Sequence, residues 1–232
     1  MKKLLLISLV ILTLFGGKKL YFDVYDSDNV RVESNIKYHI ITFKEGSTDF
    51  SVSKEKNDDY NFYVNSNFFT SEGTPIGGVV VNNKTINRQL NKGGSFIVGI
   101  DNTPNITFNK VRKVKHLSQT HIWALKGGEI NEKVLTQNHA KKKVNRLLIG
   151  KNKKGEITVI HSNLLVLVTM EDIIKTAKEY GLVDAIILDS GPSIDIKVNQ
   201  GLYTHRMETI PFFLQDYFGY PKPVVYIGGN FI

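Results

Sequence analysis

The segment Leu188–Ser193 carries the densest set of reactive side chains in the sequence. It reads Leu-Asp-Ser-Gly-Pro-Ser and ends the apolar run Ala185–Leu188, which predicts a strand buried on both faces. Such a strand would hold the Asp189 carboxylate rigidly, and the Gly-Pro turn would then expose it. Ligand crevices of α/β sheets lie at the carboxyl ends of strands, but Asp, Ser, Gly and Pro also form ordinary turns. The motif therefore indicates either a catalytic turn or a simple loop.

Two other segments favour the catalytic interpretation. Arg146 opens the predicted strand Leu147–Gly150, and a charge beside a buried run indicates an inward-facing partner. Asn67 lies among aromatic residues at the end of the β-like run Val64–Phe69. Each signal is weak alone, because a strand-end Asn is usually a turn residue and an Arg usually extends its head group to solvent. Together they predict one polar site around Arg146 and Asp189.

The elements that must position this site are mainly short strands. Runs rich in β-branched and aromatic residues predict strands, and turn residues between such runs predict hairpins. The predicted strands are Tyr21–Tyr25, Val30–Glu33 and Tyr38–Phe43, and the predicted hairpins are Val79–Ile86, Ile122–Ile130 and Leu147–Ile160.

One helix is clear from the sequence. Thr169 and Asp172 have capping-box spacing, an apolar stripe follows, and Gly181 suits the helix end. Strand, helix and strand over Glu156–Leu188 predict a crossover, which would be right-handed if its strands are parallel. A shorter helix is expected to begin near Thr209. We therefore predict an α+β fold with a strand-rich mixed sheet, a few helices and one βαβ-like crossover near the C-terminal half.

The first residues read as an export signal. Lys2 and Lys3 precede the apolar stretch Leu4–Phe15, which is shorter than the ~20 residues that a spanning helix needs. We expect a signal segment at 1–17 and a single domain at 18–232. The mature protein is expected to be secreted, periplasmic or located in the cell envelope. An uncleaved anchor stays open as an alternative, and no stable membrane insertion is expected after signal removal.

Composition excludes several classes of site. The chain has no cysteine, which rules out disulfides, thiolate nucleophiles and thiolate zinc sites. The net charge is +8 and the pI about 9.4, but the basic residues are scattered. The one dense run, Lys141–Lys143, has no interleaved aromatic residues, so we expect a solubilising surface and no nucleic-acid partner.

In order and spacing, these segments resemble the phosphodiester glycosidase family, or NAGPA domain. That family has an Asn-x-x-Phe-like element, a Gly-Pro-x-Gly-type segment, an Arg that opens a strand, then a hairpin, a helix and a strand ending in Leu-Asp-Gly-Gly-Gly-Ser. The resemblance covers roughly Tyr60 to Ile227. The counterparts here are Asn67-Phe68-Phe69, Pro75–Gly78, Arg146–Gly150 and Leu188–Ser193, with Arg206 after the last turn.

The resemblance implies an exported hydrolase that cleaves a sugar from a glycosyl phosphodiester, such as an N-acetylglucosamine-1-phosphodiester. It implies Asp189 and Arg146 as catalytic residues, the latter as a bidentate phosphate binder. The residues implied to bind substrate are Asn67, Ser190, Gly191 and Arg206. We expect no cofactor and no metal, because Asp189 alone is a poor ligand set for zinc or calcium.

The sequence also departs from the family pattern. Ser190 and Pro192 stand where the family has glycines, which permit close backbone approach to a ligand. This departure favours an alternative, a non-catalytic binder of phosphorylated sugars or polymers with the same fold. Two histidines close to the site in sequence, His161 and His205, are more often structural hydrogen-bonding residues than proton-transfer groups.

Overall fold

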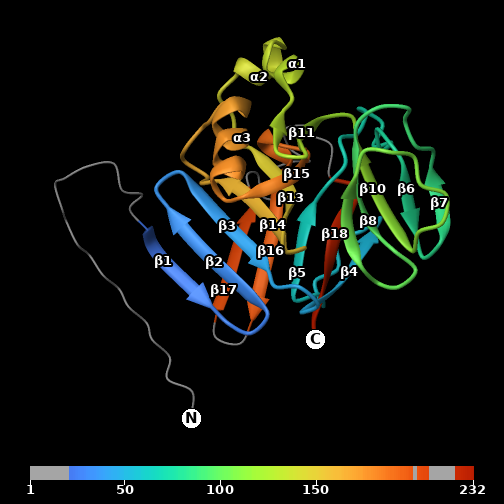
Figure 1. Cartoon of the computed structure of the whole chain (residues 1–232), viewed down its shortest axis with the longest axis horizontal. Helices are drawn as coiled ribbons and strands as arrows, with labels where there is room; N and C mark the ends of the chain where they lie inside the picture. Colours follow the sequence, from blue (N-terminus) through green and yellow to red (C-terminus); the bar gives the residue numbers. More distant parts are fainter. Residues whose placement is uncertain (1–20, 201–202, 209–222) are drawn as a thin grey trace.

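A computed structural model describes residues 21–200, 203–208 and 223–232, and these residues form three sheets and a small group of helices (Figure 1). The predicted signal segment and the helix expected near Thr209 lie outside the described residues. Within the part of the chain that the structure describes, every helix is too short or too polar to cross a bilayer.

The largest sheet has eight strands. Its spatial order is β1 (Tyr21–Asp26), β2 (Val30–Asn35), β3 (Tyr38–Phe43), β14 (Ile157–Ser162), β13 (Leu147–Asn152), β15 (Leu182–Ile187), β11 (Trp123–Lys126) and β12 (Glu129–Ile130). The predicted strands at its N-terminal edge and the hairpins β11–β12 and β13–β14 are confirmed.

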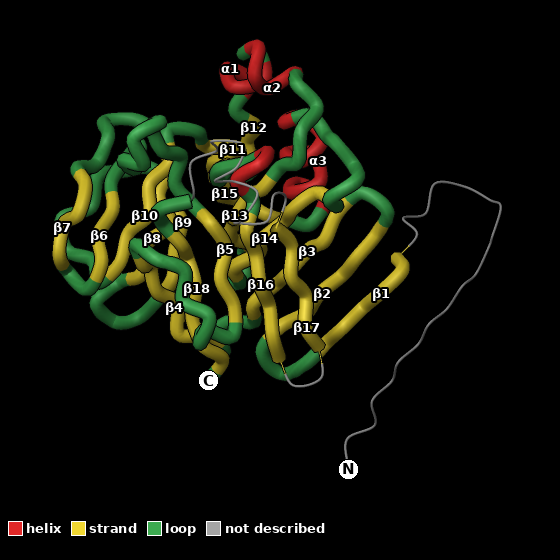
Figure 2. The backbone as a smooth tube through the Cα atoms, turned by 180° about the vertical axis from the view of Figure 1, so that it is seen from behind, coloured by secondary structure: helices red, strands yellow, loops and turns green. Residues whose placement is uncertain are grey.

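Two five-stranded sheets complete the fold. One has the order β17 (Tyr203–Glu208), β16 (Asp195–Gln200), β5 (Phe62–Asn65), β18 (Tyr226–Phe231) and β4 (Thr48–Ser53). The other has the order β7 (Lys84–Asn87), β6 (Val79–Val81), β10 (His116–Thr120), β8 (Gly94–Val98) and β9 (Pro104–Thr107). Seen from behind, β16 and β17 lie across β14 and β3 of the large sheet (Figure 2).

The helices lie on one face of the eight-stranded sheet. They are α1 (Glu132–Leu135), α2 (Asn138–Lys141) and α3 (Met170–Glu179), and a 3-10 turn, η1 (Gly191–Ser193), follows β15. The predicted capping box of α3 is confirmed, since Thr169 and Asp172 exchange side-chain and backbone hydrogen bonds.

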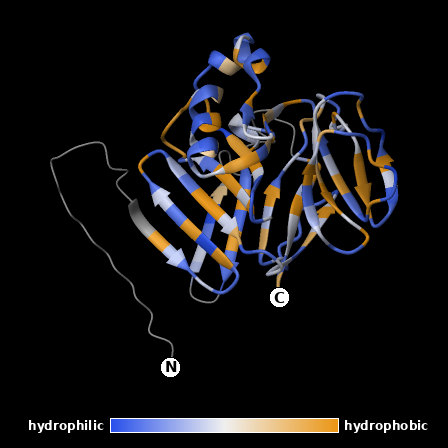
Figure 3. Ribbon diagram, in the orientation of Figure 1, coloured by the Kyte–Doolittle hydropathy of each residue, from blue (hydrophilic) through white to orange (hydrophobic). Residues whose placement is uncertain are grey.

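Side-chain alternation along the strands separates two cores. On β13, Leu147 and Ile149 pack into the core between the sheets, whereas Leu148 packs toward α3. On strands with one exposed face, such as β2, hydrophobic and hydrophilic residues alternate instead (Figure 3). Both faces of β13 and β15 are covered, so residues at their ends are held rigidly even where they are polar.

The mixed sheet that the sequence predicted is wrong for the described strands, because every pairing between them is antiparallel. The physical reason is that β13 lies between β14 and β15 and pairs with both. α3 therefore connects two strands that do not touch each other. A continuous apolar run such as 185–188 reports burial on both faces, and it does not report strand direction.

Candidate functional site

The turn after the carboxyl end of β15 contacts the polar segments that follow β5 and precede β13. The backbone N–H of Asp189 donates to the carbonyl of Ser66, which follows β5, at 2.9 Å, and the Gly191 N–H donates to the Asn145 carbonyl at 2.8 Å. The side-chain amide of Asn65 donates to the Asp189 carbonyl at 3.2 Å. The turn after β15 is thus tied to two sheets at once.

The carboxyl group of Asp189 is buried and only half satisfied. The residue is 8% exposed, and its Oδ1 accepts a hydrogen bond from the Ser190 N–H at 3.0 Å. Burial raises the pKa of Asp189 to about 7, against the opposing effect of hydrogen bonds from Ser193 and Ser190. Its Oδ2 is buried and has no hydrogen-bond partner among the described residues. A carboxyl group with these properties can exchange a proton near neutral pH.

Ser190 and Gly191 shape the turn. The Ser190 hydroxyl accepts from the Leu147 N–H at 3.2 Å and donates to the Leu188 carbonyl at 2.9 Å, so it replaces a missing ladder bond between β13 and β15. Gly191 has φ +74°, a region that favours glycine. Ser190 thus acts on the backbone, while Gly191 lets the chain reverse beside Asp189.

Asn67 lies at the same junction but is fully occupied by protein contacts. It is 1% exposed, and its amide donates to the Gln119 carbonyl at 2.7 Å. Its Oδ1 accepts from the hydroxyls of Ser66 and Ser118. Gly77 lies against the same carbonyl of Gln119, where a Cβ would collide with the oxygen. Asn67 therefore connects β5 to β10 across the sheet junction.

Arg146 lies beside Asp189 in the strand register. β13 and β15 pair Leu148 with Ile187, and continuing this antiparallel register by two residues places Arg146 opposite Asp189. Its Nη2 donates to the carbonyls of His139 at 2.7 Å and Lys142 at 2.8 Å, which fixes the end of α2. Arg146 is 5% exposed, and its Nε is a second buried atom without a partner among the described residues.

Two histidines that the sequence analysis did not single out lie near Arg146: His139 is close to its guanidinium, and His121 is close to His139. Partial desolvation lowers the pKa of His139, and the charges of Arg146 and Lys142 lower it further. Desolvation also lowers the pKa of His121, with a smaller effect from His139. The His121 ring packs on Phe68, with centroids 4.9 Å apart. The only sequence signal was that both histidines precede Arg146 in loop-like segments.

The two remaining substrate contacts suggested by sequence have different positions. Arg206 is exposed on β17 and pairs with Lys197 of β16, whose ammonium lies 5.9 Å from the centre of the Tyr63 ring. Cross-strand partners share a sheet face, so Arg206 lies on the Tyr63 face of that five-stranded sheet. The structure thus brings Asp189, Ser190, Gly191 and Asn67 together, with Arg146 opposite Asp189, and places Arg206 on a separate strand face.

A second buried carboxylate supports the turn from the other side. Asp195 is 1% exposed, forms an ion pair with Lys56 at 3.2 Å, and donates its backbone N–H to the Asn65 side chain at 2.9 Å. Asn65 in turn holds the Asp189 carbonyl. The sequence signal was an aspartate between Ile194 and Ile196 in an apolar strand, which indicates a buried, paired charge.

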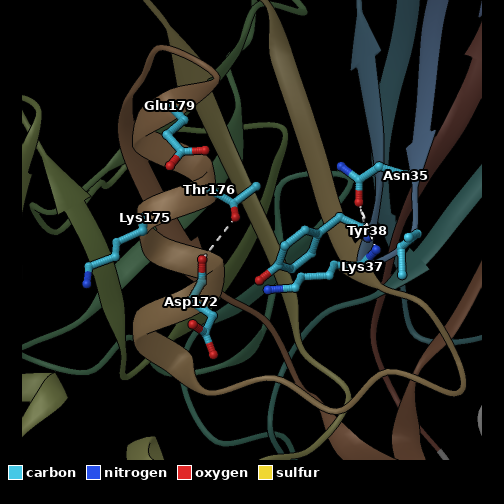
Figure 4. Close-up of a pocket in the computed structure, with 8 residues that line it drawn as sticks. Asn35, Lys37, Tyr38, Asp172, Lys175, Thr176 and Glu179 are labelled. Atoms are coloured by element: carbon cyan, nitrogen blue, oxygen red, sulfur yellow. Dashed lines mark hydrogen bonds between the residues drawn. The ribbon is translucent and has the colours of Figure 1, made fainter. Parts of the chain in front are cut away.

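A separate hollow of about 400 Å³ lies between α3 and the start of β3 (Figure 4). Tyr38 faces α3 there, and the charged lining residues are balanced in sign. They are Lys37, Asp172, Lys175 and Glu179. None of the site residues predicted from the sequence lines this hollow, and its balanced charge gives it no preference for an anion.

Comparisons with known proteins identify the family and the fold. The family model for phosphodiester glycosidases (NAGPA) matches residues 58–208, which confirms the resemblance inferred from the sequence. The chain is similar to the catalytic domain of zebrafish N-acetylglucosamine-1-phosphodiester alpha-N-acetylglucosaminidase, solved as a form auto-inhibited by its pro-peptide. That match has a TM-score of 0.61 and 15% identity, and covers 91% of this chain and 82% of the zebrafish chain.

Two bacterial structures are also similar. A hypothetical protein from Synechocystis has a TM-score of 0.59 and 9% identity, and the match covers 90% of this chain and 61% of that one. A putative exported protein from Burkholderia pseudomallei has a TM-score of 0.53 and 8% identity, with 87% and 74% covered. At these identities the likeness shows the fold. No curated protein sequence matches the chain.

Proposed function

Because the chain belongs to the phosphodiester glycosidase family, we propose that it hydrolyses a glycosyl phosphodiester and releases the sugar. The observation that carries this proposal is that two of the five buried side-chain atoms without a hydrogen-bond partner among the described residues belong to Arg146 and Asp189. Arg146 Nε is a donor and Asp189 Oδ2 is an acceptor, and continuing the register of β13 and β15 places the two residues opposite each other. Native proteins rarely leave buried polar atoms unsatisfied without a reason, and a bound substrate supplies one here.

The charges favour an anionic substrate. The cationic side chains of Arg146 and Lys142 both lie close enough to His139 to lower its pKa. Negative charge grows on the phosphate oxygen as the bond to the sugar breaks, and fixed donors aimed at that oxygen stabilise the transition state. Both hydrogens of Arg146 Nη2 are held by carbonyls at the end of α2, so the donor that it offers the phosphate is Nε.

Asp189 is the proton acceptor in this mechanism. Water attacks the anomeric carbon, the bond from that carbon to the phosphate oxygen breaks, and its electron pair leaves with the phosphate. The proton of the attacking water passes to Asp189. A phosphate leaving group needs little protonation, so a base with a pKa about 7 suits the reaction at neutral pH. Asn67 and Ser190 are positioning residues, since their side chains bond to the protein.

The test is turnover of a small substrate panel by the purified protein, followed by mass spectrometry. The panel contains an N-acetylglucosamine-1-phosphodiester, other sugar phosphodiesters and the matching nitrophenyl glycosides. We expect hydrolysis of a phosphodiester, little hydrolysis of neutral glycosides, and weaker phosphodiester binding at high salt. Arg146→Lys should lower turnover about 10²–10³-fold, as loss of an oriented donor does. Equal hydrolysis of both substrate types would contradict the proposal.

A second candidate is a binding protein that captures phosphorylated sugars or polymers without turnover. The observation that favours it is the Ser190 hydroxyl, which is used up by the backbone at a position where the family has a glycine. Calorimetry separates the two functions: a binder gives saturable heat with a phosphodiester that stays intact in the same sample.

We further propose that the protein acts outside the cytoplasm. The apolar stretch Leu4–Phe15 after Lys2 and Lys3 supports export. N-terminal sequencing of extracellular or periplasmic material should find a start near Lys18. Recovery only from the cytosol, with Met1 intact, would contradict this.

A further inference from the structure

Three histidines from distant parts of the chain meet between two sheets. His39 on β3 pairs directly with His161 on β14, and His205 reaches them from β17 of a five-stranded sheet. One ring nitrogen from each lies within 4.8 Å of the others, and the Nε2 atoms of His161 and His205 are 3.0 Å apart. The ring centroids are 4.4–5.1 Å apart; His161 stacks on both other rings, and His39 and His205 are tilted relative to each other.

The outer nitrogens of two of these rings are held by the protein. His161 Nδ1 lies 3.1 Å from the Ser162 carbonyl, which can only accept, so Nδ1 carries the hydrogen and Nε2 presents its lone pair. His39 Nδ1 lies 2.6 Å from the Ser34 hydroxyl. Partners of this kind fix the tautomer and orientation of histidines that bind metals.

The cluster is largely shielded from solvent. His161 is fully buried, and His39 and His205 are half-buried. The three imidazoles form a nitrogen-only ligand set, which suits zinc and its neighbours in the transition series.

We propose that His39, His161 and His205 bind one divalent transition-metal ion of the Zn²⁺ class, which joins the eight-stranded sheet to β17. Zn–N distances of about 2.0–2.1 Å require nitrogens roughly 3.4 Å apart in a tetrahedron. The 3.0 Å pair is close to this spacing, and because all three ligand atoms lie within 4.8 Å of one another, each remaining distance needs to shorten by at most about 1.4 Å.

The proposed ion is structural. β17 is the edge strand of its sheet, and its contact with β1 includes the stacked rings of Tyr25 and Tyr203, 4.7 Å apart. A metal would add a second fixed link between the sheets. His161 lies opposite Leu147, which faces the core between the sheets, whereas Arg146 is the next residue and faces the other way. The metal proposal rests on the proposed function in no step, so an experiment can contradict either proposal without affecting the other.

The test is titration of the purified, metal-stripped, tag-free protein with Zn²⁺ by calorimetry and with Co²⁺ by visible absorption. We expect one ion per chain with a Kd below about 1 μM, a cobalt spectrum typical of tetrahedral coordination, and a Tm that rises with free Zn²⁺. His39→Ala and His205→Ala should each weaken binding more than 100-fold. The matched control is His139→Gln, an exposed histidine outside the cluster, which should bind like the wild type.

Circular dichroism checks that each variant folds. If removal of a ligand unfolds the chain, Ser34→Ala leaves all three ligands in place and should weaken binding about 10–100-fold through loss of the partner to His39. The proposal is overturned if the wild type binds neither ion stoichiometrically, or if the folded His39→Ala, His205→Ala or Ser34→Ala variants bind as tightly as the control. In that case the cluster is a neutral hydrogen-bonded histidine pair stacked on a third ring.

Discussion

Two groups of buried polar residues meet at the end of β15, and they differ in how completely the protein satisfies them. In the Asn67 group, the side chains of Ser66, Asn67 and Ser118 bond to one another and to the Gln119 carbonyl. In the pair formed by Asp189 and Arg146, each residue keeps one buried atom without a partner among the described residues. The two groups are about equally buried.

This difference distinguishes residues that support the fold from residues that act in the reaction. A fully bonded network stabilises a single arrangement of the sheets, and removing one member leaves buried groups unsatisfied. An unsatisfied acid and an unsatisfied donor instead lower stability until a ligand binds them, which is typical of active sites. We therefore expect variants of the first group to lose stability and variants of the second to lose activity.

The largest effect should come from Asp189→Asn. Loss of the base should lower turnover of a phosphodiester about 10²–10⁴-fold, while thermal unfolding stays at or above the wild-type Tm because a buried ionisable group is removed. The control is Asp184→Asn on the same strand, whose side chain only accepts from the Gly127 N–H. If Asp189→Asn mainly unfolds the protein, Asp189 is a structural partner and the comparison fails.

Asn67→Ala should give the opposite result. It removes one donor and one acceptor from a buried network, and we expect the free energy of unfolding to fall by about 2–4 kcal/mol. Denaturant unfolding monitored by circular dichroism measures this loss. A variant that keeps wild-type stability but no longer binds substrate would show that Asn67 contacts the sugar instead.

The pH dependence of stability sharpens the assignment of Asp189. Its folded pKa, about 7, exceeds the ordinary aspartate value of 3.8. The folded state therefore keeps the proton to higher pH than the unfolded state does. The Asp189 contribution to stability is fully present below about pH 4 and is lost as pH rises to about 7, by at most about 1.4 kcal/mol per pH unit.

Two measurements test this dependence. Tm recorded from pH 4 to 8 should fall less steeply in Asp189→Asn than in the wild type. Turnover should rise over the same range as the carboxylate forms, and level off above pH 7. A stability slope that is identical in both proteins would mean that Asp189 is ionised throughout this range.

The sequence predicted the local elements well because their signals are local. The Asn82-Asn83 turn between β6 and β7 needs positive φ at both residues and has φ of 48° and 62°. The α3 cap depends on two residues three positions apart. The division into three antiparallel sheets was not predicted, because the partner of a strand depends on residues far away in the sequence.

The same reasoning explains what sequence showed of the site. Asp189, Ser190 and Gly191 were found because they are contiguous, and Asn67 and Arg146 because they have the family's order. Asp195 and the three histidines between the sheets were not found as a site, since their partners come from separate strands. The sequence could not show that Asn67 bonds to other protein groups, because a structural amide and a ligand-binding amide look alike in sequence.

Arg206→Ala should have the smallest effect and tests whether positive charge alone suffices. Arg206 and Arg146 both occupy positions expected from the family's order of motifs. Arg146 is buried opposite Asp189, whereas Arg206 is exposed on β17, on the sheet face that carries Tyr63. Water and salt screen an exposed charge, so its contribution is at most about 1 kcal/mol. We expect less than about a fivefold loss of phosphodiester turnover and a change in unfolding free energy within about 0.5 kcal/mol.

The matched comparison is Arg146→Ala, measured on the same substrate at low and at high salt. If charge near the site were enough, the two alanine variants would lose similar activity, and salt would reduce both losses. If the orientation of the Arg146 donor matters, the Arg146→Ala loss exceeds the Arg206→Ala loss by more than tenfold and persists at high salt, because a desolvated donor is not screened. A loss at Arg206 equal to that at Arg146 would place both cations on one substrate phosphate and would end the distinction between the two arginines.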